Sequence, residues 1–304
     1  MNMIIAVLRQ AGACYAIMPH LSSLMGLGCD VKVIAFEVAY KVCLDIMRDA
    51  GSMPVKLANS EVEARSIFNE SLPHARLLIT GTSFESKYDA FYWRKARELK
   101  IESIAYVDQW SNLEERFLGL ESCEFPNEIC VIDSLAHQAL AKIIPSDTKI
   151  NVVGSPILTY LEDYVFKDRK NYQEENTQDI TLFCSEPCRS VKDQRHKYGF
   201  CDEDSFIMAY DYQRRYHQES TFLIRLHPTD RRERWLRFLD EGFTFGWDED
   251  SKIQSLIKAS RVFGMTSFYL LEALAVGTEV ISFQPNKKSF IPLTDGRMRI
   301  LTHL

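Results

Sequence analysis

The sequence predicts an α/β protein made of two consecutive Rossmann-like domains, each built around a parallel sheet. Short apolar runs typical of buried strands alternate with longer segments in which apolar residues recur at helical spacing. Such alternation implies β-α-β units with right-handed crossovers. A polar stretch at 162–179 interrupts it near the middle of the 304 residues, and each half is long enough for a domain of roughly 150 residues.

The first series of elements begins with a predicted strand at 1–9. The next segment, 12–28, spaces Tyr15, Met18 and Leu21 for one helical face and ends on glycines. The other predicted strands of this half are 30–36, 75–80, 102–108, 128–133 and 150–154, and its other predicted helices are 61–72, 88–100 and 135–143.

The second series follows a predicted linker. The stretch 162–179 is charged, with scattered aromatic residues, so we expect a first domain at 1–160, a linker at 161–180 and a second domain at 181–304. The predicted strands of the second domain are 180–185, 221–227, 243–247, 261–265 and 279–283, and its predicted helices are 203–217, 231–239, 251–259 and 267–276.

Composition and charge argue against several classes of protein. The chain has 36 Lys plus Arg against 42 Asp plus Glu, a net charge of -6, which argues against broad nucleic-acid binding. No apolar run approaches the roughly 18 residues needed to span a bilayer, and residues 1–10 lack the basic start and long apolar core of a signal peptide. The expected location is the cytoplasm. The eight cysteines lie mostly in apolar stretches, which suits reduced, buried thiols better than disulfides.

A His-Pro pair closes one of the predicted strands. The apolar run 222–224 leads into His227 and Pro228, and proline cannot donate to a sheet ladder, so the strand should stop there. His227 then lies near the carboxyl end of a strand, which is where ligands bind in open α/β sheets. A purely structural histidine is the alternative.

A second candidate site is the turn at Thr266 and Ser267, between the predicted strand 261–265 and a helix that ends at Gly277. The hydroxyls and free backbone N–H groups at such a helix start can hold a phosphate. Simple capping of the helix is the alternative.

Several segments together resemble a known superfamily. Residues 264–283, GMTSFYLLEALAVGTEVISF, resemble the nucleotide-binding turn of glycosyltransferases and epimerases with the GT-B fold, two facing Rossmann domains. Residues 77–117 resemble the acceptor-side domain of that superfamily, and 129–143 followed by 150–162 resemble its end. Within the superfamily, FLIRLHPTD together with MTS is similar to the His-Pro and Ser/Thr pair of bacterial sialyltransferases, polysialyltransferases, Kdo transferases and teichoic-acid glycerophosphotransferases, which use cytidine nucleotides.

This resemblance implies a nucleotide cleft between the domains. A nucleotide leaving group gains negative charge on its phosphate as the sugar bond breaks, and an imidazole N–H or imidazolium can stabilise it. The residues implied to bind the nucleotide are His227, Pro228, Thr266, Ser267 and Glu272. Glu272 would face the ribose, although a glutamate near a helix start is also favoured by the helix dipole. Many retaining members carry another Glu eight residues earlier, where this chain has Gly264, so we expect an inverting transfer.

An inverting transfer needs a base to take the proton of the acceptor hydroxyl. The candidates are Asp108, just past a predicted strand, and Glu85, in a loop after another; either could instead cap a helix. His20, inside a predicted helix, is a weaker candidate.

No metal site is predicted. The Asp-x-Asp patterns at 201–205 and 247–251 look like exposed acidic turns or helix starts. Cys184 and Cys188 lack a second pair at zinc-site spacing.

The sequence therefore predicts a glycosyltransferase that moves a sugar, more specifically a CMP-linked acidic sugar, from a nucleotide donor to a surface-glycan or lipid-linked acceptor, with no further cofactor. The alternatives are a nucleotide-sugar 2-epimerase or hydrolase of the same fold, and a non-catalytic nucleotide-binding or partner-binding relative. The stretch 289–304 is short beside the tail of many GT-B enzymes, so we also consider a more open cleft, or one completed by another subunit in a homo-oligomer. Peripheral contact with a membrane is compatible with this function.

Overall fold

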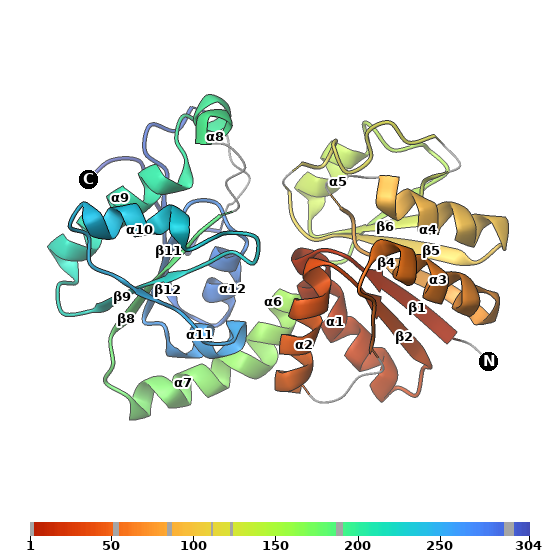
Figure 1. Ribbon diagram of the computed structural model, residues 1–304, viewed down its shortest axis with the longest axis horizontal. Coiled ribbons are helices and arrows are strands. Elements are labelled where there is room, and N and C mark those ends of the chain that lie inside the picture. Colours follow the sequence, from red (N-terminus) through yellow and green to blue (C-terminus); the bar gives the residue numbers. More distant parts are fainter. Residues whose placement is uncertain are drawn as a thin grey trace. The chain divides into compact units, whose positions relative to one another are not determined.

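The computed structural model describes residues 3–50, 55–83, 87–110, 112–121, 124–186, 191–288 and 295–304. The chain divides into two compact units, Met1–Ile157 and Leu158–Leu304, and each contains one parallel sheet (Figure 1). The prediction of two consecutive parallel-sheet α/β domains is confirmed, while the cleft expected between them stays a prediction. None of the helices in the described ranges has the length and apolar character needed to cross a membrane.

The first domain has a seven-stranded sheet in the order β3-β2-β1-β4-β5-β6-β7. All neighbouring strands are parallel, and the order reverses between β1 and β4. The strands are β1 (Met3–Leu8), β2 (Val31–Ala35), β3 (Val55–Leu57), β4 (Ala75–Thr80), β5 (Glu102–Val107), β6 (Glu128–Val131) and β7 (Lys149–Val152). The helices are α1 (Ala11–Gly26), α2 (Val38–Ala50), α3 (Glu61–Ser71), the 3-10 turn η1 (Leu72–His74), α4 (Lys87–Glu98), α5 (Ser134–Leu140) and α6 (Pro156–Tyr160).

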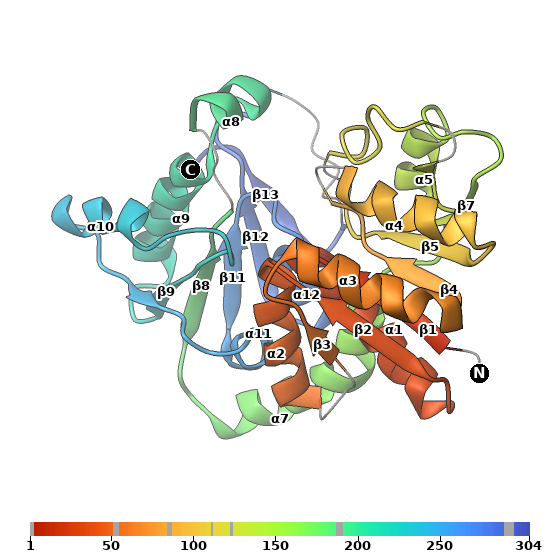
Figure 2. The same cartoon turned by 45° about the vertical axis from the view of Figure 1, so that its right-hand side comes forward.

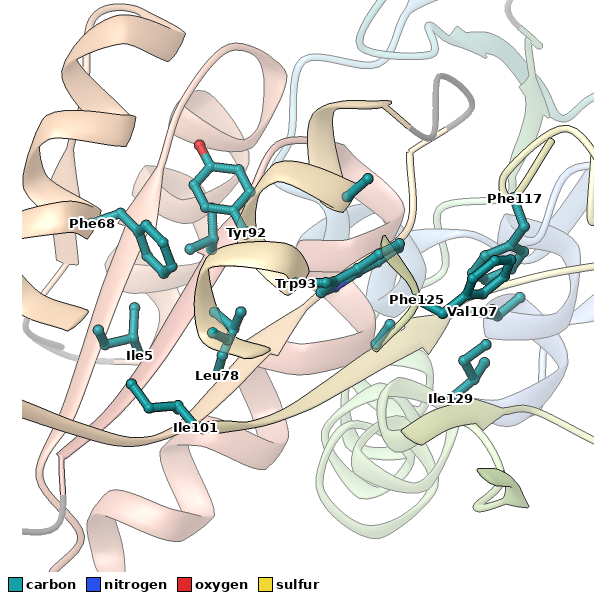
Figure 3. Packing of buried hydrophobic residues seen from close by; sticks show 14 of the residues in the cluster. Ile5, Phe68, Leu78, Tyr92, Trp93, Ile101, Val107, Phe117, Phe125 and Ile129 are labelled. Atoms are coloured by element: carbon teal, nitrogen blue, oxygen red, sulfur yellow. The ribbon is translucent and has the colours of Figure 1, made fainter. Parts of the chain in front are cut away.

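Helices cover both faces of this first sheet. One core contains residues of α1 and α2, and the other contains residues of α3, α4 and α5. Figure 3 shows the second of these cores, where the indole N–H of Trp93 donates to the hydroxyl of Thr80 at 2.9 Å and the rings of Phe117 and Phe125 stack. The indole bond satisfies a polar group that would otherwise be costly to bury. Strand β4 is thus tied to α4 at its carboxyl end.

The second domain has a six-stranded parallel sheet in the order β10-β9-β8-β11-β12-β13. The strands are β8 (Ile180–Cys184), β9 (Thr221–Arg225), β10 (Gly246–Trp247), β11 (Arg261–Gly264), β12 (Glu279–Phe283) and β13 (Arg299–Leu301). The helices are the π-helical turn η3 (Leu161–Val165), α7 (Phe166–Glu175), α8 (Val191–Tyr198), α9 (Asp202–Tyr216), α10 (Glu233–Asp240), α11 (Lys252–Lys258) and α12 (Tyr269–Ala275).

An aromatic core holds α9 and α10 on one face of the second sheet, with α12 on the other face (Figure 2). Phe206 of α9 lies at its centre, fully buried, within 5.3 Å ring-to-ring of Phe183 and within 5.1 Å of Trp235. Edge-to-face aromatic pairs of this kind contribute roughly 0.5–1.5 kcal/mol beyond their area burial. The aromatic contacts therefore hold α10 against α9 and β8.

The segment expected as a linker, 161–180, is helical for most of its length and belongs to the second unit. In α7, Arg169 donates to the carbonyl of Ala259, and Gln173 donates to the carbonyl of Ile257 at 3.2 Å. No side chain of α7 is fully buried. The helix is held by polar contacts to backbone carbonyls, which is why its sequence lacks an apolar stripe.

Candidate functional site

The carboxyl edge of the second sheet brings three neighbouring strand ends together. Strand β8 lies between β9 and β11, so the connections leave it toward opposite sides of the sheet. In open α/β sheets this switch point is where ligands bind. The residues that follow the three strands there are Ser185, Glu186, His227, Thr266 and Ser267.

Hydrogen bonds fix both the position and the tautomer of His227. Its backbone N–H donates to the hydroxyl of Ser185 at 2.9 Å, which joins the end of β9 to the end of β8. Its ring Nδ1 accepts the backbone N–H of Thr229 at 3.2 Å and lies 2.9 Å from the hydroxyl of the same residue. Because an accepting nitrogen carries no proton, the neutral ring carries its N–H on Nε2.

The imidazole of His227 is neutral at physiological pH. Burial lowers its pKa from 6.5 to about 4, against the opposing effect of Asp230, and the charge of Lys252 lowers it further. A neutral ring with the proton on Nε2 is a hydrogen-bond donor rather than a cation. Of the two forms considered from the sequence, the imidazole N–H is therefore the one present near pH 7.

Thr266 lies at the same edge, and a carboxylate holds it. The backbone N–H of Thr266 donates to Oε1 of Glu186, and its hydroxyl donates to Oε2 at 2.8 Å. The hydroxyl of Ser267 accepts the backbone N–H of Tyr269 at 3.2 Å, just ahead of α12. The N-cap of that helix is Phe268, which makes no side-chain cap, so the capping expected of Thr266 or Ser267 is not seen, and both donors of Thr266 are used by Glu186.

Sequence reasoning missed Glu186, although a signal for it exists. Cys184 of β8 pairs with Gly264 of β11, so residues two places further on, Glu186 and Thr266, emerge side by side. Glu186 is also the first acidic residue after its strand, the same property that singled out Asp108 after β5.

Burial raises the pKa of Glu186 to about 7. The bonds from Thr266 oppose this effect, and the nearby carboxyl of Asp202 adds to it. Burial likewise raises the pKa of Asp202 to about 6, although Arg234 pairs with its carboxylate and lowers it. The backbone N–H of Glu186 donates to the carboxylate of Asp202, so a hydrogen bond joins the two residues.

The structure explains why position 264 carries glycine. A Cβ added to Gly264 would lie 2.4 Å from Sγ of Cys184 and 3.2 Å from Cδ2 of Leu270. Real Cβ atoms do not approach a neighbour to 2.4 Å, so a larger residue forces β11 or Cys184 to move. The glutamate that many retaining enzymes carry here is sterically excluded.

Glu272 and Pro228, also expected to bind nucleotide, differ in exposure. Glu272 is buried in α12 and forms an ion pair with Lys252 of α11. Pro228 is exposed directly after His227. The ribose role of Glu272 stays a prediction.

A pocket of about 200 Å³ adjoins the end of β9. It is lined by the last residues of β9, by the end of β10 and by Arg232, whose guanidinium lies 5.2 Å from the ring of Trp247. On its wall Arg225 pairs with Asp248, and Asp248 also accepts the hydroxyl of Ser255 at 2.6 Å. The pocket is therefore polar and held by buried hydrogen bonds beside His227.

In the first domain, Asp108 follows β5 at the carboxyl edge of its own sheet. Its Oδ1 accepts a hydrogen bond from Arg116 at 2.7 Å, and Arg116 also donates to the hydroxyl of Thr82, after β4. Asp108 packs against Gly12 at the start of α1, where a Cβ would lie 1.8 Å from Oδ2. The predicted base is thus one half of an ion pair in which both side chains are mostly buried.

The second predicted base, Glu85, lies outside the described residues. Near it in the chain, Asp89 of α4 accepts the backbone N–H of Ser83 at 2.6 Å. Burial raises the pKa of Asp89 to about 6, against the lowering effect of the hydrogen bonds from Ser83. His20 lies in α1, with its ring 6.3 Å from that of Tyr106.

The acidic patterns expected to be exposed are partly buried. Asp202 and Glu203 start α9, as expected of a helix start, but both are buried, because Arg234 and Arg237 of α10 pair with them. Asp248, in the other pattern, is buried as well. In the described ranges, no group of three or more His, Cys, Asp or Glu side chains is arranged to hold a metal ion. The described cysteines, among them Cys184, are unpaired.

Comparison with known proteins shows the fold. No protein-family model matches the chain, and no curated protein does. The chain is similar to the putative UDP-N-acetylglucosamine 2-epimerase of Listeria monocytogenes, with a TM-score of 0.64 and 10% identity over 94% of this chain and 80% of that one. The fold is that of the GT-B proteins.

Two further GT-B structures cover nearly the whole chain. The UDP-GlcNAc 2-epimerase of Neisseria meningitidis bound to UDP-GlcNAc has a TM-score of 0.55 and 13% identity over 92% of this chain and 82% of its own. The glycotransferase of kitacinnamycin has a TM-score of 0.55 and 8% identity over 99% and 86%. The resemblance seen in the sequence is therefore confirmed for the GT-B fold, and the narrower similarity to CMP-sugar transferases stays a prediction.

Proposed function

We propose that the protein is a glycosyltransferase whose nucleotide-sugar donor binds at the carboxyl edge of the second sheet. The observation that supports this is the hydrogen-bonded line across three neighbouring strand ends: His227 to Ser185, and Thr266 to Glu186. These contacts lie at the switch point of the sheet, where side chains from separate strands converge on one ligand position.

In this proposal the donor's phosphate faces His227 and the turn at Thr266. The Nε2–H of the neutral imidazole donates to a phosphate oxygen, and the Thr266 donors complete the contact. Charge on that oxygen grows as the sugar bond breaks, so a fixed donor stabilises the transition state more than the ground state. A hydrogen bond to such a charged group contributes about 1.5–3 kcal/mol.

The nucleoside occupies the pocket between the ends of β9 and β10. The pocket continues from Leu226, the neighbour of His227, toward the ring of Trp247. Its wall provides both guanidinium donors and carboxylate acceptors, which suit the edge of a nucleobase. A CMP-linked acidic sugar remains the preferred donor on the similarity of the His-Pro and Thr-Ser segments to cytidine-using transferases.

The transfer is proposed to invert the sugar configuration, because Gly264 has no room for the further acid of retaining relatives. Asp108 or Glu85 is the proposed base. For Asp108 to act, its Oδ2 would take the proton of the acceptor hydroxyl while Arg116 holds Oδ1. Fixing one carboxylate oxygen orients the other, which favours proton transfer.

A nucleotide-sugar 2-epimerase is the second candidate. The specific observation that favours it is Asp89, whose pKa of about 6 suits removal and return of a ring proton near neutral pH. Asp89 lies in the first turn of α4, the helix that follows β4, and β4 is the sheet neighbour of β5, the strand that precedes Asp108.

Calorimetric titration with CMP, CDP, UMP and UDP tests the proposed site. We expect cytidine nucleotides to bind, and H227A and S267A each to weaken binding by about 1–3 kcal/mol, roughly 5- to 150-fold. H227Q should retain part of the affinity, because its amide places an N–H near the position of Nε2. H217A is the matched control, since His217 ends α9 at the opposite, amino edge of the same sheet. Equal losses in H217A and H227A would refute the site.

Product analysis separates the two candidate reactions. CMP-linked acidic sugars and UDP-GlcNAc are each incubated with the protein, and the anomeric and C2 protons of the sugar are followed by NMR. Release of CMP, with the sugar transferred to an added glycan or to water, supports the transferase. Exchange of the C2 proton of UDP-GlcNAc, lost in D89N but retained in H217A, supports the epimerase instead.

A further inference from the structure

Glu186 holds the donors that a phosphate at Thr266 needs. Both oxygens of its carboxylate are used, one by the backbone N–H and one by the hydroxyl of Thr266. Two anions cannot share these donors without strong repulsion in a partly buried site. A phosphate that binds here must therefore displace the carboxylate or meet it in its neutral form.

The surroundings of Glu186 disfavour its charge. On α9 it faces Asp202, and beyond that acid lie Asp230 and the guanidinium of Arg234, which pairs with both. On its own strand it faces the buried thiol of Cys184. Among the described residues, Asp202 thus adds a like charge beside Glu186, and Arg234 is already paired with the two aspartates. Consistent with this, the pKa of Glu186 is raised to about 7, so one proton is readily gained near neutral pH.

We propose that Glu186 couples binding of the nucleotide phosphate to uptake of one proton. The ionised carboxylate plus one proton from solvent becomes a carboxylic acid, and the new O–H donates to a phosphate oxygen. The Thr266 donors are then released to the phosphate. This inference rests on the proposed function, since it requires a nucleotide at this edge.

The test measures proton uptake on binding of CMP. Wild type and E186Q are titrated with CMP at pH 6, 7 and 8, each in two buffers of different ionisation enthalpy. Gln keeps the size of the side chain and an oxygen for Thr266 but cannot titrate. E279Q is the matched control, because Glu279 begins β12 at the amino edge of the same sheet. CMP also gains protons near pH 6 on its own phosphate, and this contribution is common to all three proteins.

At pH 8 we expect wild type and E279Q to take up close to one proton more than E186Q. Since a site with a pKa near 7 is about nine-tenths protonated at pH 6 and about one-tenth at pH 8, wild-type affinity should fall roughly tenfold more than that of E186Q over this range. At pH 8, E186Q should bind CMP more tightly than wild type does. E186A, which removes the acceptor altogether, should show the same loss of pH dependence.

Two outcomes overturn the proposal, and they are distinguishable. If wild type and E186Q both bind CMP with equal proton uptake, phosphate binding is not coupled to protonation of Glu186, although the proposed function stands. If neither binds CMP, CDP, UMP or UDP at millimolar concentration, the nucleotide site is refuted and the inference fails with it. Matching circular dichroism spectra and thermal melts establish that the variants are folded.

Discussion

Substituting Gly264 by alanine should destabilise the second domain through one contact. The added Cβ lies 2.4 Å from Sγ of Cys184, about 1 Å closer than ordinary van der Waals contact, and 3.2 Å from Leu270. Both neighbours are buried, so neither can swing into solvent. The perturbation is therefore overpacking between the adjacent strands β8 and β11.

The expected magnitude follows from two opposing effects. Overpacking a tight core costs about 1–3 kcal/mol, while replacing glycine in a strand recovers roughly 0.5–1 kcal/mol of backbone entropy. G264A should thus destabilise the domain by about 1–2 kcal/mol. C184A alone should cost on the order of 1 kcal/mol, since it removes a buried sulfur that donates to the carbonyl of Phe263.

The double variant G264A/C184A isolates the contact. Because the sulfur is absent, the new methyl group fills the vacated space, and the double variant should cost about 1 kcal/mol or less. Additivity would give about 2–3 kcal/mol, so the coupling free energy is expected to be roughly 1–2 kcal/mol in favour of the pair. This value exceeds the few tenths expected of independent sites.

Hydrogen exchange read by mass spectrometry at increasing urea concentration is the suitable assay. The chain forms two compact units, so a single global unfolding transition is not assumed. Peptides covering β8 and β11 report the opening free energy of the second domain, and peptides covering β1 and β4 serve as an internal control. The steric reasoning would be refuted if the stability losses of the two single variants add up to that of the double variant. A loss of equal size in the first domain would also refute it.

Three other predictions follow from burial, charge and pKa. F206A should lower the stability of the second domain by about 3–5 kcal/mol in urea denaturation, whereas I207A on the exposed side of the same helix should change it by less than about 1 kcal/mol. R116M breaks a buried ion pair and should cost about 3–5 kcal/mol, against about 0–1 kcal/mol for R94M in a surface pair; similar losses would contradict the burial argument. In the folded protein the pKa of His227 is about 4, below its usual 6.5, so its neutral form contributes stability above pH 6.5 that is lost as pH falls toward 4. H227Q should therefore flatten the pH dependence of the free energy of unfolding between pH 4 and 6.5. An unchanged slope would exclude a neutral histidine at this position.

The sequence was sufficient for the fold where elements are long and strongly apolar. Strands such as β1 and β8, buried on both faces, are continuous apolar runs and were predicted within a few residues. Strands β3 and β13 are not indicated by the sequence, because each has three residues with a charged residue among them, VKL and RIL. Helix α7 lies in the segment predicted as a linker, where the sequence indicates no helix because polar bonds to backbone carbonyls replace an apolar stripe.

The candidate site was predicted in part for similar reasons. His227 and Thr266 could be placed because a strand end precedes each of them. Glu186 could not be paired with Thr266, because that pairing depends on the register of strands that bring together residues 80 positions apart. The burial of Asp202 depends on its pairing with Arg234, 32 positions away, and the local sequence around Asp202 does not indicate that partner. Nothing in the sequence indicated the tautomer of His227, which depends on the path of the backbone at Thr229.

The contact between Gly12 and Asp108 offers a way to recognise relatives of this chain. Any side chain at position 12 would collide with the carboxylate, and the carboxylate in turn is held by Arg116. The three identities are therefore interdependent although they are far apart in the sequence. Homologues too divergent for overall similarity to be detected should keep all three together or change them together, so this triplet can serve as a fingerprint in searches where no family profile matches.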